Sequence, residues 1–462
     1  MLILARLLDQ KDFGLVAIAS SFVFLFDILS DAGTQQYIVQ KKELTDDDLH
    51  TAWSLNLILK CISWLIFILC IPAITNFFGS PELSPVLYAI SLILPVAGLE
   101  NTGIFLFYRN FDFTPVLKIT TIEKIASLII VISLAVIYRS YWAMVTGVLL
   151  TFSIRTLASY HYSSFRPRFR LTNALEQWAF SKWLLLKGGV GFSRAEFDTF
   201  MVTKLFGIEY VGGYNMMKNI ANIPGRDLIA PATEPLLTSF AKVRDDNERL
   251  NYQISLSLFV VCLISFPIAS YTYFFADNIV YVLLGEEWLS YSNVLSIMSL
   301  LILAATLMSI FQNALTATGN VKAVFYYDLL SLFFVVGVLL IFAFKDVEIF
   351  VLVRCALSIV TVACMFFFIS RSFKLPGLKM ISLLLPIMVL AGISGYLTSL
   401  LRLSMGQHEY ANFFLLPSIY FTLYALLCLC FFYQMRHTPE VSHVHGMLRD
   451  NLARLRSIRK AN

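Results

Sequence analysis

Long runs of apolar residues, separated by short polar segments, recur from one end of the chain to the other. A helix needs about 20 mostly apolar residues to cross the roughly 30 Å hydrocarbon core of a bilayer. Outer-membrane strands alternate polar and apolar positions in segments of about 10 residues, whereas the runs here are continuous. The pattern predicts an all-α polytopic membrane protein whose spans lie at 12–36, 51–74, 84–107, 113–138, 142–163, 178–206, 210–240, 252–275, 289–317, 321–344, 347–370, 378–401 and 411–434.

A further apolar segment, Met1–Leu8, opens the chain and is too short to cross a membrane. Its pattern is that of the last turns of a helix, so we count it as span 1 and the run at 12–36 as span 2. This numbering gives fourteen spans. We expect the functional protein to start upstream of Met1, with residues that complete span 1.

An internal repeat relates the two halves of the chain at an offset of 198 residues. Arg6-Leu7-Leu8 and Phe13-Gly14 in the first half correspond to Lys204-Leu205-Phe206 and Val211-Gly212 in the second. Each copy lies at the junction of the first two helices in a block of six. Transporters are often built from two such halves, with the substrate site between them. The repeat therefore predicts an N-terminal lobe at 1–164, a C-terminal lobe at 165–375, and two extra spans at 376–435.

Lys and Arg are unevenly distributed among the segments between the spans. If both termini are cytoplasmic, the inside segments and the tail hold 19 of these residues and the outside segments hold six. Cytoplasmic loops carry such an excess, so we expect this orientation. In the tail, 436–462, basic residues flank a face of leucines, which predicts an amphipathic helix on the anionic inner leaflet. A solvated basic end is the alternative.

The composition agrees with a membrane protein and narrows the chemistry. The chain is 58% hydrophobic and 14% charged, against about 45–50% and 25% in soluble proteins. A net charge of +5 is small for 462 residues and predicts no nucleic-acid partner. The seven cysteines lie in apolar runs without a CxxC pair, so neither a metal site nor a cofactor is expected. No loop is long enough for a separate catalytic domain, so we do not expect an enzyme.

Ionisable residues within the spans are the candidates for function, because each costs about 2.5–3.5 kcal/mol at bilayer depth. Span 2 carries Asp27 and Asp31, whose spacing places both on one helix face. A carboxylate there could couple transport to a proton or cation, or could serve as a cap or ion-pair partner. Spans 4 to 6 carry further charges at Glu100, Lys118, Glu123, Lys124 and Arg155.

Spans 7 and 8 are the richest in polar residues. Lys187, Arg194 and Asp198 share one face of span 7. A second stripe, in span 8, consists of Asn215, Lys218, Asn219, Asn222 and Arg226. Three prolines, Pro224, Pro231 and Pro235, predict kinks in span 8, which are tolerated beside protein or a watery cavity. Arg binds phosphate through two parallel hydrogen bonds, so the pattern favours a hydrated, partly cationic cavity for an anion such as a lipid diphosphate. Pairing of these bases with neighbouring acids is the alternative.

Longer motifs surround the two repeat copies. In the first half they are Leu4-Ala5-Arg6-Leu7-Leu8-Asp9, Asp12-Phe13-Gly14-Leu15-Val16-Ala17, Ser30-Asp31-Ala32-Gly33 and Ile38-Val39-Gln40-Lys41-Lys42-Glu43. In the second half they are Asp198-Thr199-Phe200, Lys204-Leu205-Phe206-Gly207, Gly212-Gly213-Tyr214-Asn215 and Phe240-Ala241-Lys242-Val243-Arg244-Asp245-Asp246. These motifs resemble those of Wzx-type polysaccharide flippases, closest to the colanic-acid branch of the polysaccharide transporter family. The similarity covers nearly the whole chain.

The resemblance implies a two-lobed helical fold of the MOP superfamily, similar to multidrug extruders, that works by alternating access in the bacterial inner membrane. The implied cargo is an undecaprenyl-diphosphate-linked oligosaccharide for exopolysaccharide or lipopolysaccharide biosynthesis, and polysaccharide polymerase and export proteins are the implied partners beside the lipid bilayer. On this reading the cargo cavity consists of Lys187, Arg194, Asn215, Lys218, Asn222 and Arg226, and the coupling or structural charges are Asp27, Asp31 and Asp198.

Three other functions are weighed against this one. A multidrug extruder of the same superfamily should have a cavity of aromatics and acids rather than Lys and Arg. A membrane polymerase or glycosyltransferase normally needs a sizeable extracytoplasmic loop, and the sequence has none long enough. A component of the export machinery without transport activity of its own is the third alternative.

Overall fold

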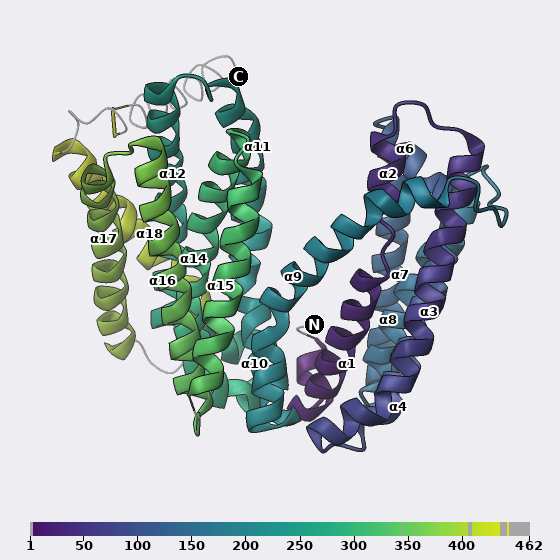
Figure 1. The fold of residues 1–462 in the computed structure, drawn as a ribbon. Coiled ribbons are helices and arrows are strands. Elements are labelled where there is room, and N and C mark those ends of the chain that lie inside the picture. The colour runs from purple at the N-terminus through teal and green to yellow at the C-terminus, as the bar shows by residue number, and fades with distance from the viewer. Residues whose placement is uncertain (1–2, 343, 405–408, 435–440, 443–462) are drawn as a thin grey trace, which may run out of the picture. The chain divides into compact units, whose positions relative to one another are not determined.

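The computed structural model describes residues 3–342, 344–404, 409–434 and 441–442 (Figure 1). Helices without strands make up the regular structure of these residues, which confirms the all-α prediction. Helices coincide with all thirteen expected spans. Ten are long and apolar enough to cross a membrane, or eleven if the bent pair at 83–98 and 102–109 is one span. The helix predicted for the tail at 436–462 lies outside the described residues, apart from 441–442.

Contacts divide the chain into two compact units, Met1–Asn215 and Met216–Asn462. The first contains α1 (Gln10–Leu29), α2 (Thr34–Gln40), α3 (Asp46–Phe78), α4 (Leu83–Ser91), α5 (Ile93–Gly98), α6 (Phe105–Arg109), α7 (Thr114–Tyr138), α8 (Trp142–Tyr162), α9 (Ala174–Phe206) and the start of α10 (Ile208–Ile223). The second contains the rest of α10 and α11 (Ala230–Lys242), α12 (Asn247–Phe274), α13 (Ala276–Leu283), α14 (Ser292–Ala317), α15 (Val321–Ile341), α16 (Val347–Phe373), α17 (Gly377–Ser404) and α18 (Glu409–Gln434). The division into lobes at 164 stays a prediction.

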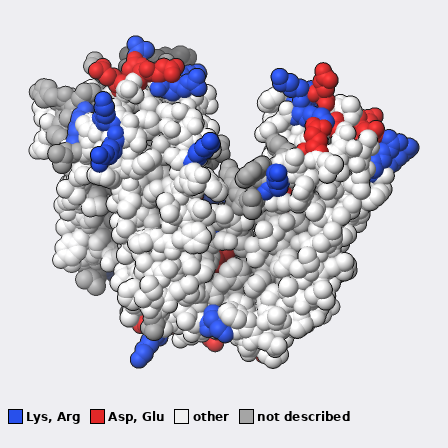
Figure 2. Space-filling model, in the orientation of Figure 1, with Lys and Arg blue, Asp and Glu red and all other residues white. Residues whose placement is uncertain are grey.

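Apolar side chains cover the outer surfaces of the helices. On the face drawn in Figure 2, most charged side chains lie near the helix ends and a broad uncharged surface lies between them. In the second unit, α17 and α18 pack on α12, where the Tyr424 hydroxyl donates to the Leu263 carbonyl at 3.0 Å. The two extra spans are therefore packed parts of the second unit.

A candidate membrane span at Gln10–Gln40 confirms the apolar span predicted at 12–36, but this span is not one continuous helix. Helix α1 ends at Leu29, and Gly33 adopts φ +59° before α2 begins at Thr34. A carboxylate oxygen of Asp31 accepts the Gly33 N–H at 2.9 Å, and the Ser30 hydroxyl donates to the Phe26 carbonyl at 2.6 Å. Short polar side chains that bond the local backbone, followed by a glycine, favour a turn over a helix. Asp31 therefore lies in a turn and not on the helical stripe of Asp27.

The proline-rich part of span 8 is irregular, as its composition predicted. Helix α10 passes into a π-helical segment at Pro224–Ile229, and α11 follows it. Proline has no N–H for the helical ladder, so the ordinary hydrogen-bond pattern cannot continue through this segment. Such π-segments inside helices are frequent at functional sites.

Helices α1 and α10 meet backbone to backbone at two glycines. A Cβ atom on Gly14 would clash with the carbonyl oxygen of Ile208, and a Cβ atom on Gly212 would clash with the carbonyl oxygen of Gln10. Gly14 and Gly212 are the glycines that the repeat pairs at an offset of 198, and the same offset relates Gln10 to Ile208. The two repeat copies therefore touch each other at equivalent positions.

Candidate functional site

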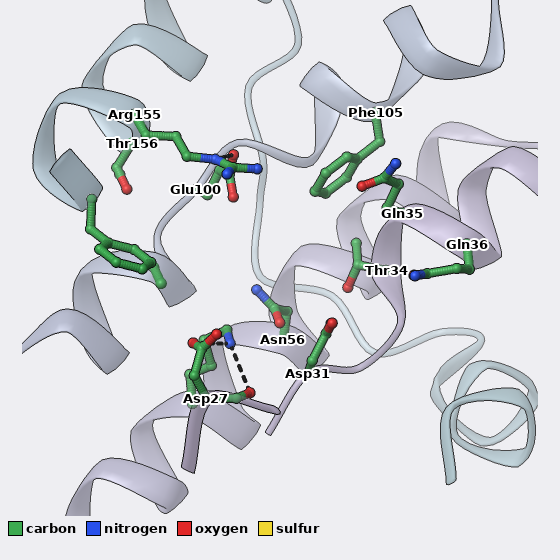
Figure 3. Close-up of a pocket in the computed structure, with 13 residues that line it drawn as sticks. Asp27, Asp31, Thr34, Gln35, Gln36, Asn56, Glu100, Phe105, Arg155 and Thr156 are labelled. Atoms are coloured by element: carbon green, nitrogen blue, oxygen red, sulfur yellow. Dashed lines mark hydrogen bonds and ion pairs between the residues drawn. The ribbon is translucent and has the colours of Figure 1, made fainter. Parts of the chain in front are cut away.

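A polar cavity of about 180 Å³ lies among the helices of the first unit (Figure 3). Its walls come from α1, α2, α3, α5, α6 and α8 and from the turns after α1 and α5. The lining residues are Asp27, Asp31, Thr34, Gln35, Gln36, Asn56, Lys60, Ala97, Glu100, Phe105, Phe152, Arg155 and Thr156. Most of them are polar, although they come from helices whose outer faces are apolar.

One wall holds a buried ion pair between α1 and α3. The Lys60 ammonium lies 2.7 Å from a carboxylate oxygen of Asp27 and donates also to the Asp27 carbonyl at 3.3 Å. Nearby, the Ser63 hydroxyl donates to the Phe26 carbonyl at 2.9 Å and fixes α3 against the same turn of α1. The Lys60 side chain is 7% exposed, so its charge depends on Asp27 for compensation.

The opposite wall holds a second ion pair, between Glu100 and Arg155 on α8, with Nε and Oε1 2.8 Å apart. Glu100 lies in the break after α5, and hydrogen bonds of the next residue, Asn101, hold the backbone of that break in place. The Asn101 N–H donates to the Ser159 hydroxyl at 2.9 Å, and the Asn101 amide donates to the Phe165 carbonyl at 2.7 Å. The bend in span 4 therefore directs a carboxylate into the cavity.

Polar groups without partners lie between the two ion pairs. The Thr34 hydroxyl is buried and has no hydrogen-bond partner among the described residues. The side-chain amide of Asn56, which is 8% exposed, likewise has no hydrogen bond to a described residue. Buried polar groups in proteins almost always have partners, so the Thr34 hydroxyl requires a ligand or water, and the Asn56 amide is available to one. The lining holds the acids Asp27, Asp31 and Glu100 and the bases Lys60 and Arg155, which leaves one formal negative charge.

The structure brings Asp27 and Asp31 to this cavity, although they do not share a helix. Asp198, the third predicted charge, lies elsewhere in the first unit. It is buried on α9, where it accepts the Tyr214 hydroxyl at 2.7 Å and the Thr199 N–H at 2.9 Å. The bond to Tyr214 joins α9 to α10, and the role of Asp198 as a coupling or structural charge stays a prediction.

The six residues predicted for the cargo cavity are divided between the two units, and none of the five whose side chains the structure describes lines the cavity described above. Arg194 on α9 and Asn215 on α10 are partly buried in the first unit, and the Lys187 side chain lies outside what the structure describes. In the second unit Lys218 is partly buried, whereas Asn222 and Arg226 are exposed. Arg226 makes two hydrogen bonds to the neighbouring Asp227, at 2.8 and 3.2 Å. A common site for all six stays a prediction.

Sequence reasoning missed Lys60 and Asn56, and it gave no role to Glu100 and Arg155. A signal for the first two was present, because Lys60 is a lone base inside the apolar run 51–74 and Asn56 precedes it by one turn. The partner of each charge is set by helix packing, which no local pattern specifies. Among the described residues, no group of three or more His, Cys, Asp or Glu side chains could hold a metal ion.

Comparison with known proteins identifies relatives of the chain. Residues 3–293 match the family described as polysaccharide biosynthesis protein. The chain is 26% identical over 349 residues to the lipopolysaccharide biosynthesis protein WzxC of Escherichia coli K12, a match that covers 74% of this chain and 70% of that protein. It is 23% identical over 337 residues to the succinoglycan biosynthesis transport protein ExoT of Rhizobium meliloti, covering 71% of this chain and 67% of that one.

Two solved structures share the fold. The lipid II flippase MurJ in an inward closed conformation superposes with a TM-score of 0.75 at 16% identity, covering 94% of this chain and 96% of that one. A multidrug resistance MATE family transporter of the MOP superfamily in an inward-facing conformation gives 0.54 at 15% identity, covering 81% and 96%. At these identities the likeness shows a common helical architecture.

Proposed function

The chain belongs to the polysaccharide biosynthesis protein family, and from this premise we propose that it is a flippase for undecaprenyl-diphosphate-linked oligosaccharides. It is a multi-pass protein of the bacterial inner membrane, and its relatives include a lipopolysaccharide biosynthesis protein and a succinoglycan biosynthesis transport protein. The proposed reaction moves the lipid-linked glycan from the cytoplasmic to the periplasmic leaflet by alternating access.

The polar cavity in the first unit is the observation that carries this proposal. Two ion pairs and several unpartnered polar groups lie among helices whose outer faces are apolar. Ionisable residues at membrane depth usually line a substrate or ion pathway, because their burial is otherwise costly. A flippase needs such a polar interior to receive the head group of its lipid while the acyl chain stays in the bilayer.

In this proposal the cationic residues Arg194 and Arg226, with Lys187 and Lys218, bind the diphosphate. Arg226 is about two-thirds exposed, and its pairing with Asp227 therefore contributes little to stability and can be exchanged for a phosphate. A guanidinium binds phosphate through two N–H groups in a fixed geometry that an ammonium cannot reproduce. Loss of that geometry should then impair transport even where the charge is kept.

The test is transport by the purified protein in liposomes. Lipid-linked oligosaccharide is incorporated with a fluorescent label, and a glycosidase added to one side reports its arrival at that leaflet. We expect the double variant Arg194→Lys, Arg226→Lys to transport at least tenfold more slowly, nearly as slowly as the double Ala variant, which corresponds to about 1.4 kcal/mol or more. Arg249→Lys is the matched control, because Arg249 forms an exposed ion pair with Asp246 on α12.

Two outcomes would overturn this assignment. Normal transport by the double Ala variant would remove the arginines from the site, and absence of transport by the unaltered protein would contradict the flippase itself. A non-transporting export component would give the second result.

A multidrug extruder is the second candidate, because acids outnumber bases in the cavity by three to two and would suit a cation. Against it, sites for drug-sized molecules typically measure about 300–1,000 Å³, and this cavity measures about 180 Å³. Extrusion of a cationic dye by the same liposomes, without movement of the lipid-linked glycan, would decide for the extruder.

A further inference from the structure

We propose that the cavity of the first unit binds one uncharged monosaccharide ring of the lipid-linked cargo, separately from its diphosphate. This assignment rests on the proposed flippase function and specifies which part of the cargo enters the cavity. It follows from the balance of charge, the unpartnered polar groups and the size of the space.

The charge of the lining argues against the diphosphate. The two bases are already paired, Lys60 with Asp27 and Arg155 with Glu100, at 2.7 and 2.8 Å. Asp31 adds a carboxylate, so the cavity carries one formal negative charge. A diphosphate placed here would meet three carboxylates and two bases that are already paired, so the net charge of the lining would repel it. A neutral, many-hydroxyl ligand meets no such penalty.

The unpartnered atoms have the mixture of donors and acceptors that hydroxyl groups require. Each carboxylate uses one oxygen in the contacts described above, and the second oxygens of Asp27, Asp31 and Glu100 have no hydrogen bond to a described residue. The Asn56 amide and the terminal guanidinium nitrogens of Arg155 can donate. The Thr34 hydroxyl, which is 3% exposed, can do either. Sugar hydroxyls are both donors and acceptors and can satisfy all of these groups.

Geometry brings these atoms to one space. In Figure 3 Thr34, Asn56 and Asp31 face the region between the two ion pairs, and the Phe105 ring borders it from α6. The electron-rich face of an aromatic ring can receive the C–H groups of a sugar face. A volume of about 180 Å³ corresponds to about six water molecules, which is enough for one ring and too little for an oligosaccharide.

The test compares two lipids that share the carrier and differ in the glycan. The probes are undecaprenyl diphosphate and the same lipid bearing the oligosaccharide, isolated from cells that lack this transporter. Binding of each to the full-length protein in nanodiscs is measured by displacement of a fluorescent undecaprenyl diphosphate. The variants are Thr34→Val and Asn56→Leu, alone and together, which remove hydrogen-bonding groups with little change in size.

We expect the unaltered protein to bind the glycan-bearing lipid more tightly than the bare carrier. The double variant should lose about tenfold in affinity for the glycan-bearing lipid and keep its affinity for bare undecaprenyl diphosphate, since each lost hydrogen bond contributes modestly. Thr34→Ser keeps the hydroxyl and should bind as the unaltered protein does. Thr151→Val on α8 is the matched control, because Thr151 bonds the Gly147 carbonyl at 2.9 Å and does not line the cavity.

The possible failures are distinguishable. If the unaltered protein binds neither lipid, the proposed function fails. If the double variant keeps the full preference for the glycan-bearing lipid, the cavity holds no sugar and the inference is overturned while the flippase stands. Equal loss for both lipids also overturns it, because the cavity would then not distinguish the glycan from the carrier. Melting temperatures of all variants identify any that are misfolded, and for these the milder Thr34→Ala replaces Thr34→Val.

Discussion

At the scale of single residues, Lys60 combines a full charge with a nearly complete burial in the middle of α3. Its ammonium is 2.7 Å from Asp27 and its side chain is 7% exposed. Removing one member of a buried pair leaves the other charge uncompensated, which typically costs about 3–5 kcal/mol, whereas replacing both by apolar groups costs much less. The ion pair is therefore a place where two substitutions should be better tolerated than one.

We predict that Asp27→Asn destabilises the protein by about 3 kcal/mol and that Asp27→Leu with Lys60→Met restores most of the loss. Thermal unfolding of the detergent-solubilised protein measures both. Lys118→Met, on the exposed surface of α7, is the control and should change little. If the double variant is as unstable as the sum of Asp27→Leu and Lys60→Met, each measured alone, the two side chains do not compensate each other.

At Asp31 a substitution can remove the charge of the side chain without changing the turn that the side chain holds. One carboxylate oxygen accepts the Gly33 N–H at 2.9 Å and holds the turn between α1 and α2. An asparagine can make the same bond through its amide oxygen, so Asp31→Asn keeps the turn and removes only the charge. We predict that Asp31→Asn abolishes glycan export at normal membrane levels, as expected of a coupling carboxylate. Full export by this variant, measured in cells that lack the native gene, would show that the charge has no role.

At the scale of elements, a cluster of polar side chains joins the α2–α3 corner to the start of α9. The Lys41 ammonium lies 2.8 Å from Asp48 and 3.1 Å from Glu176, and it donates to the Tyr37 hydroxyl at 2.9 Å. Arg109 completes the corner by donating to the carbonyls of residues 38, 41 and 42. The segment that enters α9 is therefore held by charge-assisted bonds in addition to the apolar packing of Phe165.

We predict that Lys41→Met destabilises this corner by about 2 kcal/mol and increases hydrogen exchange at 163–175. Burial lowers the pKa of Lys41, but its bonds to Asp48, Tyr37 and Glu176 outweigh burial and raise that pKa above the usual 10.5. Because the pKa of Lys41 is raised, its charge-assisted bonds contribute fully to the stability of the corner below pH 10.5. That contribution is lost as the pH rises through the pKa of Lys41 in the folded protein. The protection factor at this corner, which corrects for base-catalysed exchange, should therefore fall at strongly alkaline pH in the unaltered protein and not in Lys41→Met. Equal pH dependence in both would contradict the assignment.

The hydrophobic pattern predicted the helices well because each span is a run of about 20 apolar residues. Such a run is stable in the membrane whether its side chains contact other helices or lipid. The pattern could not place the break at 30–33, since averaging over a whole span hides four residues, even though Ser30, Asp31 and Gly33 are turn-forming types. It also could not pair Lys60 with Asp27 or Arg155 with Glu100. Those pairs are 33 and 55 residues apart in sequence and exist because particular helix faces meet.

At the scale of the whole molecule, the sequence repeat and the contact between α1 and α10 concern the same glycines. Gly14 meets the carbonyl of Ile208, and Gly212 meets the carbonyl of Gln10. We predict that Gly14→Ala and Gly212→Ala each destabilise the protein by about 1–3 kcal/mol, since a methyl group would push the two backbones apart. The double variant should cost clearly less than the sum, because the first substitution already separates the helices.

Thermal unfolding of the two single variants and the double variant, compared with the unaltered protein, completes the double-mutant cycle. Gly392→Ala on α17 is the control, because a Cβ atom there would meet nothing within 4 Å. Strict additivity would mean that the two glycines act independently. A difference confined to transport, with unchanged stability, would instead assign the contact to motion between conformations.

The reciprocal form of this contact is that of an isologous interface, in which residue i of one copy meets residue j of the other and j meets i. In a symmetric homodimer every substitution occurs twice, whereas a chain that carries both copies can alter either one alone. The two halves differ at one pair of equivalent positions and agree at the other. Glycine occurs at both 14 and 212, whereas Gln10 and Ile208 have unlike side chains. A Cβ atom on either glycine would meet a main-chain oxygen, which every residue type supplies, and on Gly14 it would also meet the side chain of Ile208. Relatives of this chain should therefore keep glycine at 14 and 212 and vary more freely at position 10 than at position 208.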